Sequence, residues 1–526
     1  MAAVSFALQE DYWENFELVE EDIEFLYNHL LELETPLTTD ELVLSLIQER
    51  IHREKSAIEK RRTSSGDLYQ PEGTYKVDQM LVFPAFNWQP GKVVSVRPGH
   101  NPDLGEFKVI KVDFSEGGER EFAANLSEHI LNNPPEIADY DPSLDQEVVL
   151  ENHSSLITTH LEEDLNTNPD FVRIAGRWFP HTLLVDVNVG HLNLAEAVLD
   201  MAEGGPQPTS DLLDQIELNA SVNPKLLEFS LDLALQEDER FDEVGPSGDI
   251  LWFLKRLEPK EVLEIPVFLN YKRIDFDHAL LSEEMVKLER DLDDELSNIT
   301  DWDGSSDTVE IKLIFPHLRS GTLPLSNRLH HLFPTAYEAP RIRFQLVDGK
   351  TGIKFPAWVV REKYYVYGLK SWYEEKELIP GSIIHVKRGG NPGEVIVDTT
   401  DQRTSREWIR TVLVGSDGGV VYALLKQLVS GQVDPRMGIA IPDLEALDDV
   451  WNQVKSKQPP FEEVVVNTVK ELAKLNPQSH VHACELYAAV NVIRRCPPGP
   501  IFALLASRPW FVHVGDLHYR LSDQEI

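Results

Sequence analysis

The chain reads Val309-Glu-Ile-Lys-Leu-Ile-Phe315, then Ser320-Gly-Thr-Leu-Pro-Leu325, Arg341-Ile-Arg-Phe-Gln-Leu-Val-Asp-Gly349, Gly368-Leu-Lys-Ser-Trp-Tyr373 and Leu378-Ile-Pro-Gly-Ser-Ile-Ile-His-Val-Lys-Arg388. In these runs apolar residues alternate with polar ones, and Gly, Pro and Asp-Gly turns separate them. Alternation with period two is typical of strands that bury one face, and closely spaced turns favour a small closed sheet. This stretch therefore predicts a compact all-β domain.

The order of these pieces resembles the B3-type DNA-binding pseudobarrel. In that family a first strand leads into a short proline-marked helix, and an Asp-x-x-Gly-like hairpin follows. A Gly-x-x-x-Trp helix turn and a Leu-x-x-Gly-Asp strand start come next. Here Leu378-Ile-Pro-Gly-Ser382 stands at the last place, with Ser382 where the family usually has Asp. The resemblance implies a B3-like pseudobarrel over residues 305–400.

Charge makes this region unusual within the chain. The formal net charge is −40, yet basic residues outnumber acidic ones between residues 340 and 410. A local basic island in an acidic protein is the footprint of a phosphate-contacting surface. The candidate DNA-binding residues are Arg341, Arg343, Lys354, Arg361, Lys363, Lys370, Lys387 and Arg388. The alternative is that these side chains decorate solvent-facing strand positions.

Composition sets the class of protein. A chain of 526 residues has room for about three to five domains, and an apolar fraction of 42% is ordinary for folded proteins. There is no basic, apolar leader at the N-terminus and no run of about 18 apolar residues, so we expect a soluble protein without a membrane partner. Two cysteines, Cys484 and Cys496, indicate a reducing, cytoplasmic location.

Residues 1–77 predict helices over 21–34 and 39–62, with Thr38 and Glu41 spaced as a capping box. This is a plausible helix-turn-helix start. Residues 78–130 change to short strands separated by glycine turns, and the order Gly91-Lys-Val-Val-Ser-Val-Arg97 followed by Val112-Asp-Phe114 resembles a Tudor- or KOW-like SH3 barrel. The resemblance implies a partner-binding surface, for which the candidate residues are Lys92, Arg97, Phe107 and Phe114. Any other small β-barrel is the alternative.

An internal repeat is the second strong signal. Residues 161–178, 233–252 and 504–519 each predict a helix end, a strand led by an aromatic residue, a glycine turn and a second strand holding an aromatic residue. Two helical segments precede the later two copies. The pattern resembles the HARE-HTH family and the folded domain of the bacterial RNA polymerase delta subunit, which implies three winged-helix modules. They would cover 143–190, with the barrel inserted into or adjacent to this first module, then 191–260 and 458–526. Residues 261–304 read as an acidic helical connector and 401–457 as a second connector.

Several motifs contain the residue types of catalytic or metal sites without the required spacing. Glu310 and Lys312, with Asp301, Asp303 and Asp307 nearby, have the acidic-x-Lys order of metal-dependent nucleases. This order is short and common by chance. His480 and His482 with Cys484 and Cys496 lack the spacing of a zinc site, and a helix cap beside a small buried cysteine fits better. We therefore expect no metal, no cofactor and no catalytic residues.

These observations predict an α+β multidomain protein of repeated winged-helix modules, one SH3-like barrel and one B3-like pseudobarrel. The function that follows is a non-enzymatic, transcription-associated regulator that contacts duplex DNA through its basic pseudobarrel. An alternative is an acidic adaptor that docks on RNA polymerase or another basic protein, because carboxylates crowd the first 34 residues. A metal-dependent nuclease or restriction-type effector is a minor alternative.

Overall fold

The computed structural model describes residues 12–522, apart from 64–66, 84–85, 87–88, 102–104, 115–117, 133–141, 217, 219–221, 298–305, 392, 401–404 and 416–417. The chain is an α+β, multidomain protein, as the sequence predicts. It divides into two compact units, Met1–Val185 with Ser221–Phe229, and Asp186–Ala220 with Ser230–Ile526. In the described residues no helix is both long and apolar enough to cross a membrane.

The first unit contains three helices and a three-stranded sheet. The helices are α1 (Glu20–Leu33), α2 (Thr39–Thr63) and α3 (Gln146–Thr167), and the strands are β1 (Leu37–Thr38), β8 (Arg177–Pro180) and β7 (Phe171–Ile174), in that sheet order. The predicted capping box starts α2: the Thr38 amide donates to Glu41 Oε2 at 2.8 Å, and the Glu41 amide donates to Thr38 Oγ1 at 3.3 Å. Leu37 pairs with Trp178, so segments far apart in sequence form one sheet.

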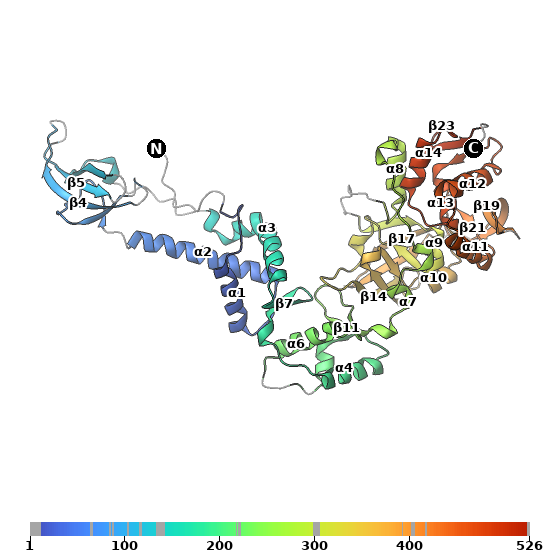
Figure 1. Ribbon diagram of the computed structural model, residues 1–526, viewed down its shortest axis with the longest axis horizontal. Helices are drawn as coiled ribbons and strands as arrows, with labels where there is room; N and C mark the ends of the chain where they lie inside the picture. The colour runs from blue at the N-terminus through green and yellow to red at the C-terminus, as the bar shows by residue number, and fades with distance from the viewer. Residues whose placement is uncertain are drawn as a thin grey trace. The chain divides into compact units, whose positions relative to one another are not determined.

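A five-stranded sheet is inserted in the chain between α2 and α3 (Figure 1). Its order is β2 (Asp67–Leu68), β3 (Met80–Phe83), β4 (Gln89–Pro98), β5 (Lys108–Phe114) and β6 (Gly118–Ala124). Its core is aromatic: the Phe83 ring centroid lies 4.7 Å from that of Tyr69, 5.1 Å from that of Phe114 and 4.4 Å from that of Phe122. The insertion explains why the helices of this unit lie on both sides of a β-rich stretch of sequence.

The arrangement of three helices and three strands occurs twice more. The second copy contains α4 (Val189–Met201), β9 (Gln207–Pro208), α5 (Thr209–Leu213), α6 (Pro224–Glu237), β10 (Phe241–Glu243) and β11 (Leu251–Leu254). The third, drawn in red in Figure 1, contains α12 (Phe461–Ala473), β22 (Val481–His482), α13 (Ala483–Ile493), α14 (Pro498–Ser507), β23 (Phe511–Gly515) and β24 (His518–Leu521). In each copy the short strand before the second helix pairs with the last strand, at Trp178, Trp252 and Tyr519.

The second unit is built around a seven-stranded sheet. Its order is β12 (Thr308–Lys312), β17 (Ile383–Arg388), β18 (Glu394–Thr399), β14 (Arg341–Asp348), β15 (Lys354–Val360), β16 (Tyr365–Tyr367) and β13 (Thr322–Pro324). Only β14 and β18 run parallel. Two short helices, α9 (Phe315–Ser320) and α10 (Lys370–Glu375), complete it. Ile342, Leu346 and Val397 are fully buried because the period-two pattern points them into one core.

The turn before β17 depends on two small residues. Gly381 has φ of 90°, and a Cβ there would lie 2.6 Å from the backbone of Met437 and Gly438, so only glycine fits. Ser382, which stands where the B3 family usually has Asp, is fully buried, and its hydroxyl accepts a hydrogen bond from the Ile379 amide at 3.0 Å. Serine thus supplies the turn-closing oxygen without burying a charge.

Residues between the large sheet and the third copy form structure of their own. They make the sheet β20 (Val420–Val429), β19 (Ser405–Val414) and β21 (Ile439–Ala440), in that order, followed by α11 (Leu444–Lys457). Val412, Tyr422 and Trp451 belong to the same hydrophobic core as α12–α14. The stretch 401–457, expected to be a connector, therefore contributes folded layers to the C-terminal part of this unit. The stretch 261–304, the expected acidic connector, contains most of α7 (Lys260–Leu263) and all of α8 (Glu283–Leu292).

Candidate functional site

The first two candidate DNA-binding residues lie in a packed joint between the second copy and the seven-stranded sheet. Arg341 Nε lies 2.8 Å from Asp242 Oδ2 and 3.1 Å from Glu258 Oε2, and its side chain is 16% exposed. Arg343 Nη1 donates to the Gly205 carbonyl at 2.6 Å, and its guanidinium carbon lies 4.9 Å from the centre of the Phe253 ring. These two side chains are committed to contacts within the chain.

Apolar packing surrounds this joint. Its buried members are Val244, Phe253, Val262, Leu269, Trp358, Val360 and Tyr365. The Phe253 and Trp358 rings meet edge to face with centroids 5.3 Å apart. The backbone also crosses the joint, because the Arg343 amide donates to the Val244 carbonyl at 2.9 Å. Burial lowers the pKa of Arg343, which reflects the loss of water around its guanidinium.

The acidic side of the joint is desolvated as well. Burial raises the pKa of Glu258 above its ordinary value, and a hydrogen bond with Asp242 adds to the effect. Burial, reinforced by the charge of Glu338, raises the pKa of Glu243 to about 8. The joint thus holds Glu243 protonated at neutral pH, although the charge of Arg361 opposes the rise in its pKa.

The other six candidate DNA-binding residues fall into two groups. Lys354 pairs with Glu394, Arg361 Nη1 donates to the Ala339 carbonyl at 2.9 Å, and Arg388 Nη2 donates to the His331 carbonyl at 2.8 Å. The second group makes no side-chain hydrogen bond or ion pair within the part of the chain that the structure describes: Lys363, Lys370 and Lys387. Lys387 lies on β17, whereas Lys363 lies between β15 and β16 on the other side of the sheet order. The structure therefore does not gather the eight candidates on one strand or turn.

The candidate partner-binding residues of the five-stranded sheet have mixed positions. Lys92 Nζ pairs with Asp78 at 2.7 Å and Arg97 with Glu121 at 2.7 Å, both on the surface. Phe107 is half-buried, and its ring lies against Gly99. Phe114 was expected to lie on a partner-binding surface, and this expectation is wrong. It is 4% exposed and packs in the aromatic core, because alternation along β5 points it inward.

A polar cluster recurs in the first two copies of the three-helix fold. Trp178 Nε1 donates to Thr39 Oγ1 at 3.1 Å, and Thr39 Oγ1 donates to Glu162 at 2.9 Å. In the second copy Trp252 Nε1 donates to Asp232 at 2.8 Å, and Thr209 also donates to Asp232. In both copies the acid comes nine residues before the aromatic residue that starts the two-stranded hairpin.

The third copy has neither the threonine nor the acid of this cluster. The equivalent positions are Ala483, Phe502 and Tyr519, all buried in the large C-terminal core. The aromatic residues make the repeat visible in the sequence. The Thr–acid–Trp cluster escapes sequence reasoning, because the two copies share only the spacing between the acid and the first aromatic residue of the hairpin.

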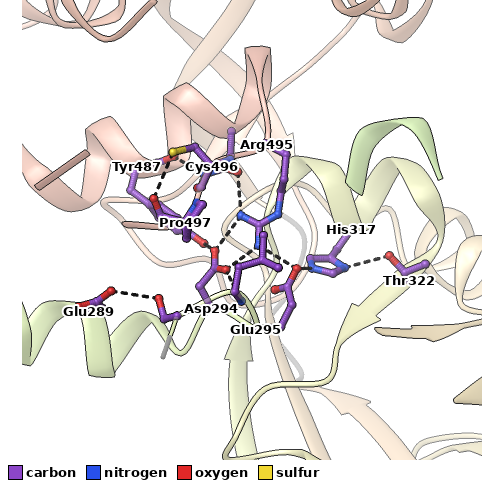
Figure 2. Close-up of polar contacts among 12 residues, drawn as sticks. Glu289, Asp294, Glu295, His317, Thr322, Tyr487, Arg495, Cys496 and Pro497 are labelled. Atoms are coloured by element: carbon purple, nitrogen blue, oxygen red, sulfur yellow. Dashed lines mark hydrogen bonds and ion pairs between the residues drawn. The ribbon is translucent and has the colours of Figure 1, made fainter. Parts of the chain in front are cut away.

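Figure 2 shows a buried charge network that links three parts of the second unit. Arg495 follows α13 and is fully buried; its Nη2 lies 2.6 Å from Asp294 and 2.8 Å from Glu295. Tyr487 donates to Asp294 at 2.6 Å, and His317 Nε2 lies 3.1 Å from Glu295. Although burial opposes ionisation, the charges of Arg495 and His317 lower the pKa of Glu295. Because these buried carboxylates face Arg495 and His317, the network holds α9, α13 and the 294–295 segment together.

Neither of the two weak catalytic or metal motifs assembles into a site among the described residues. Glu310 is exposed on β12, Lys312 pairs with Asp434 at 2.9 Å, and Asp301 and Asp303 lie outside the described residues. His482 caps α13, its Nδ1 accepting a hydrogen bond from the Cys484 amide at 3.0 Å, which confirms the predicted helix cap. Within the described ranges, no group of three or more His, Cys, Asp or Glu side chains could hold a metal ion.

Comparisons with protein-family models, with curated proteins and with solved structures returned no match for this chain. The functional argument therefore rests on the residues and their contacts.

Proposed function

We propose that the chain is a non-enzymatic, multidomain binding protein that acts as an acidic adaptor for a basic protein partner, with RNA polymerase as one candidate. In this proposal the three repeated copies are winged-helix modules, the five-stranded sheet is an SH3-like barrel and the seven-stranded sheet is a B3-like pseudobarrel. The winged-helix assignment is supported by three helices followed by a two-stranded hairpin, with a short strand before the second helix that joins the hairpin.

The observation that carries the adaptor proposal is the engagement of Arg341 by Asp242 and Glu258. Five of the eight candidate cations already contact carboxylates or backbone carbonyls of the same chain, which leaves Lys363, Lys370 and Lys387 without such a contact among the described residues. A net charge of −40 repels nucleic acid and steers the chain toward positive surfaces.

Helix α1 offers the clearest acidic surface. Glu20, Glu21, Glu24 and Glu32 are exposed, whereas Asp22 is buried against Arg50. Glu21 also lies 3.8 Å from Arg53, and the other three exposed carboxylates are available to a basic partner. We place the adaptor contact on this face of α1.

The test is recovery of partners from nuclease-treated lysate at low and moderate salt, followed by mass spectrometry. The variant Glu24→Lys/Glu32→Lys should lose the partners that the native chain retains. Glu362→Lys/Glu374→Lys is the control, because it changes net charge equally at exposed positions far along the chain. If both variants lose the partners equally, the effect comes from overall charge. If both variants retain the partners, α1 is not the contact surface.

Direct binding of duplex DNA is the second candidate function, favoured by the exposed Lys363 and Lys370 of the large sheet and by Lys387. Fluorescence anisotropy of a labelled duplex with the full chain at low salt tests it. Each phosphate contact contributes about −0.9 to the slope of log affinity against log salt. Lys363→Ala/Lys370→Ala should flatten the slope, whereas Lys260→Ala, exposed and paired with Glu264, should not. Absence of binding by the native chain at low salt would remove this candidate.

The non-enzymatic assignment has its own test. Plasmid and oligonucleotide substrates incubated with the chain and Mg²⁺ or Mn²⁺ should stay intact. Cleavage that disappears in Glu310→Ala would replace the binding protein with a metal-dependent nuclease.

A further inference from the structure

The β19–β20 hairpin carries an apolar face beyond the end of its core. The two strands pair from Ser405 with Val429 to Val414 with Val420. On one face, Val412 and Tyr422 are each 3% exposed and pack in the C-terminal core. Because side chains two apart share a face of a strand, that same face continues through Trp408, Leu424 and Leu428. There the helices no longer cover it.

These three side chains are unusually exposed for their size. Trp408 is 66% exposed, Leu424 is 44% and Leu428 is 56%. Exposed apolar side chains clustered on one face mark interaction sites more often than solitary ones do. Tryptophan is also among the residues that contribute most to protein interfaces.

Cations are interleaved with this apolar surface. Arg406 lies opposite Leu428 in the register, and Lys426 lies opposite Trp408, with its ammonium 5.5 Å from the centre of the Trp408 ring. Neither Arg406 nor Lys426 forms an ion pair with any residue that the structure describes. Arg410, on the same face, is instead held by Glu485 at 3.0 Å. We define the hairpin patch as Arg406, Trp408, Leu424, Lys426 and Leu428.

The backbone next to the patch is open on one side. In the sheet order β20-β19-β21, β20 is an edge strand within the described part of the chain. An edge strand presents unpaired amide and carbonyl groups that an incoming extended peptide can bind. Leu425, on the opposite face of β20, is also 37% exposed, so a strand added there would find apolar contacts on both faces.

We propose that the hairpin patch binds an acidic, apolar segment of a partner protein, which adds to β20 as an extra strand. On the face that the added strand shares with the patch, side chains two apart supply in turn carboxylates to Arg406 and Lys426 and apolar groups to the Trp408, Leu424 and Leu428 side chains. Charge selects this occupant: two unpaired cations stand on an apolar face in a chain of net charge −40.

The same charges weigh against the other occupants. Two copies of the chain paired through β20 would bring their own Arg406 and Lys426 side chains together, which disfavours self-association. Single-stranded nucleic acid can stack on an exposed tryptophan, but the acidic surface of the rest of the chain repels it. The hairpin patch takes an acidic segment, whereas the proposed contact on α1 takes a basic partner. Failure of one proposal therefore does not affect the other.

The test uses the full chain at low salt and a fluorescein-labelled peptide of eight residues, in which Glu and Val take turns at every second position with Thr between them (the Glu-Val peptide), so that one face carries both Glu and Val. Anisotropy should report binding, and a Lys-Val peptide of the same length should not bind. Trp408→Ala and Arg406→Glu/Lys426→Glu should each weaken binding of the Glu-Val peptide at least tenfold. Lys363→Glu/Lys370→Glu is the control for charge and should leave it unchanged.

Hydrogen exchange supplies the structural readout. Saturating Glu-Val peptide should slow exchange at amides of residues 420–429 more than elsewhere in the chain. The milder Arg406→Gln/Lys426→Gln variant repeats the comparison with less risk to folding. The proposal is overturned if the native chain does not bind the peptide, if binding survives the patch variants, or if β20 gains no protection. It is equally overturned if the patch variants instead abolish self-association in sedimentation or binding of a single-stranded oligonucleotide.

Discussion

Trp252 donates its indole N–H to the Asp232 carboxylate at 2.8 Å, inside a module where both residues are about 1% exposed. In the first copy Trp178 donates to Thr39 at the same position, and in the third copy Ala483, Phe502 and Tyr519 replace the Thr, acid and Trp residues. One fold therefore carries two kinds of core within one chain. Every donor and acceptor of a buried polar cluster needs a hydrogen-bond partner, because each one left without a partner destabilises the fold by about 1–3 kcal/mol.

This relationship predicts the effect of Asp232→Leu. The change leaves the Thr209 hydroxyl without its acceptor, whereas the Trp252 N–H keeps a longer hydrogen bond to Thr209 Oγ1 at 3.2 Å, so the second copy should lose about 1–3 kcal/mol. Native-state hydrogen exchange of amides in α6 and β11 measures the loss locally, which a multidomain melt cannot. Thr209→Ala/Asp232→Leu, which imitates the third copy, should cost less than the sum of its single changes. Full additivity would show that the cluster does not act as a unit.

The buried network around Arg495 predicts a larger penalty. Arg495→Met strands Asp294 and Glu295 out of solvent, and breaking such a pair costs about 3–5 kcal/mol. Exchange of amides in α13 and α9 should rise together, because the network joins them. Arg494→Met, at the neighbouring, more exposed position, is the control. Unchanged exchange in α9 would contradict the linking role.

The joint between the second copy and the large sheet should weaken at alkaline pH. Glu243 has a folded-state pKa of about 8, raised by burial and by Glu338, whereas its ordinary value is 4.5. Because the folded value is the higher one, the contribution is fully present below pH 4.5 and is lost as pH rises through about 8. Hydrogen exchange of residues 244–254 from pH 6 to 9, corrected for intrinsic rates, measures it. Glu243→Gln should remove the dependence, and its persistence there would assign it to other groups.

The cap of α13 predicts the opposite response, at acidic pH. Burial, with the nearby charges of Arg436 and His518, lowers the pKa of His482 to about 4 from 6.5. An unfolded chain binds this proton more readily, so stability is present above pH 6.5 and is lost as pH falls toward 4. His482→Asn keeps a side-chain cap without a titrating group and should resist this loss. Exchange of the α13 amides between pH 7 and 5 decides between these outcomes.

Features set by near neighbours in the chain are predictable. The Thr38–Glu41 box, the cap at His482 and the inward side chains of β14 follow from spacings of two to four residues. The repeat can be found because each copy has an aromatic residue at the start of the hairpin that follows its third helix. Phe114 is easily mistaken for a surface residue because a short strand has two faces, and its own residues do not say which face is covered. The hairpin patch is hidden from sequence reasoning because alternation around Trp408 looks the same whether or not a helix packs on it.

The sequence by itself determined the α+β class, the caps at Thr38 and His482 and the three repeated segments, since these depend on local periodicity and turn chemistry, whereas the strands of 401–457 were not predicted. Only the tertiary structure decided what the charges do. Arg341 meets Asp242 from 99 residues away, and Arg495 meets Asp294 from 201 residues away. A charge binds whichever opposite charge the fold brings within a few ångströms, and composition does not reveal that neighbour. For the same reason Arg406 and Lys426 stand without an ion-pair partner among the described residues, on an apolar face.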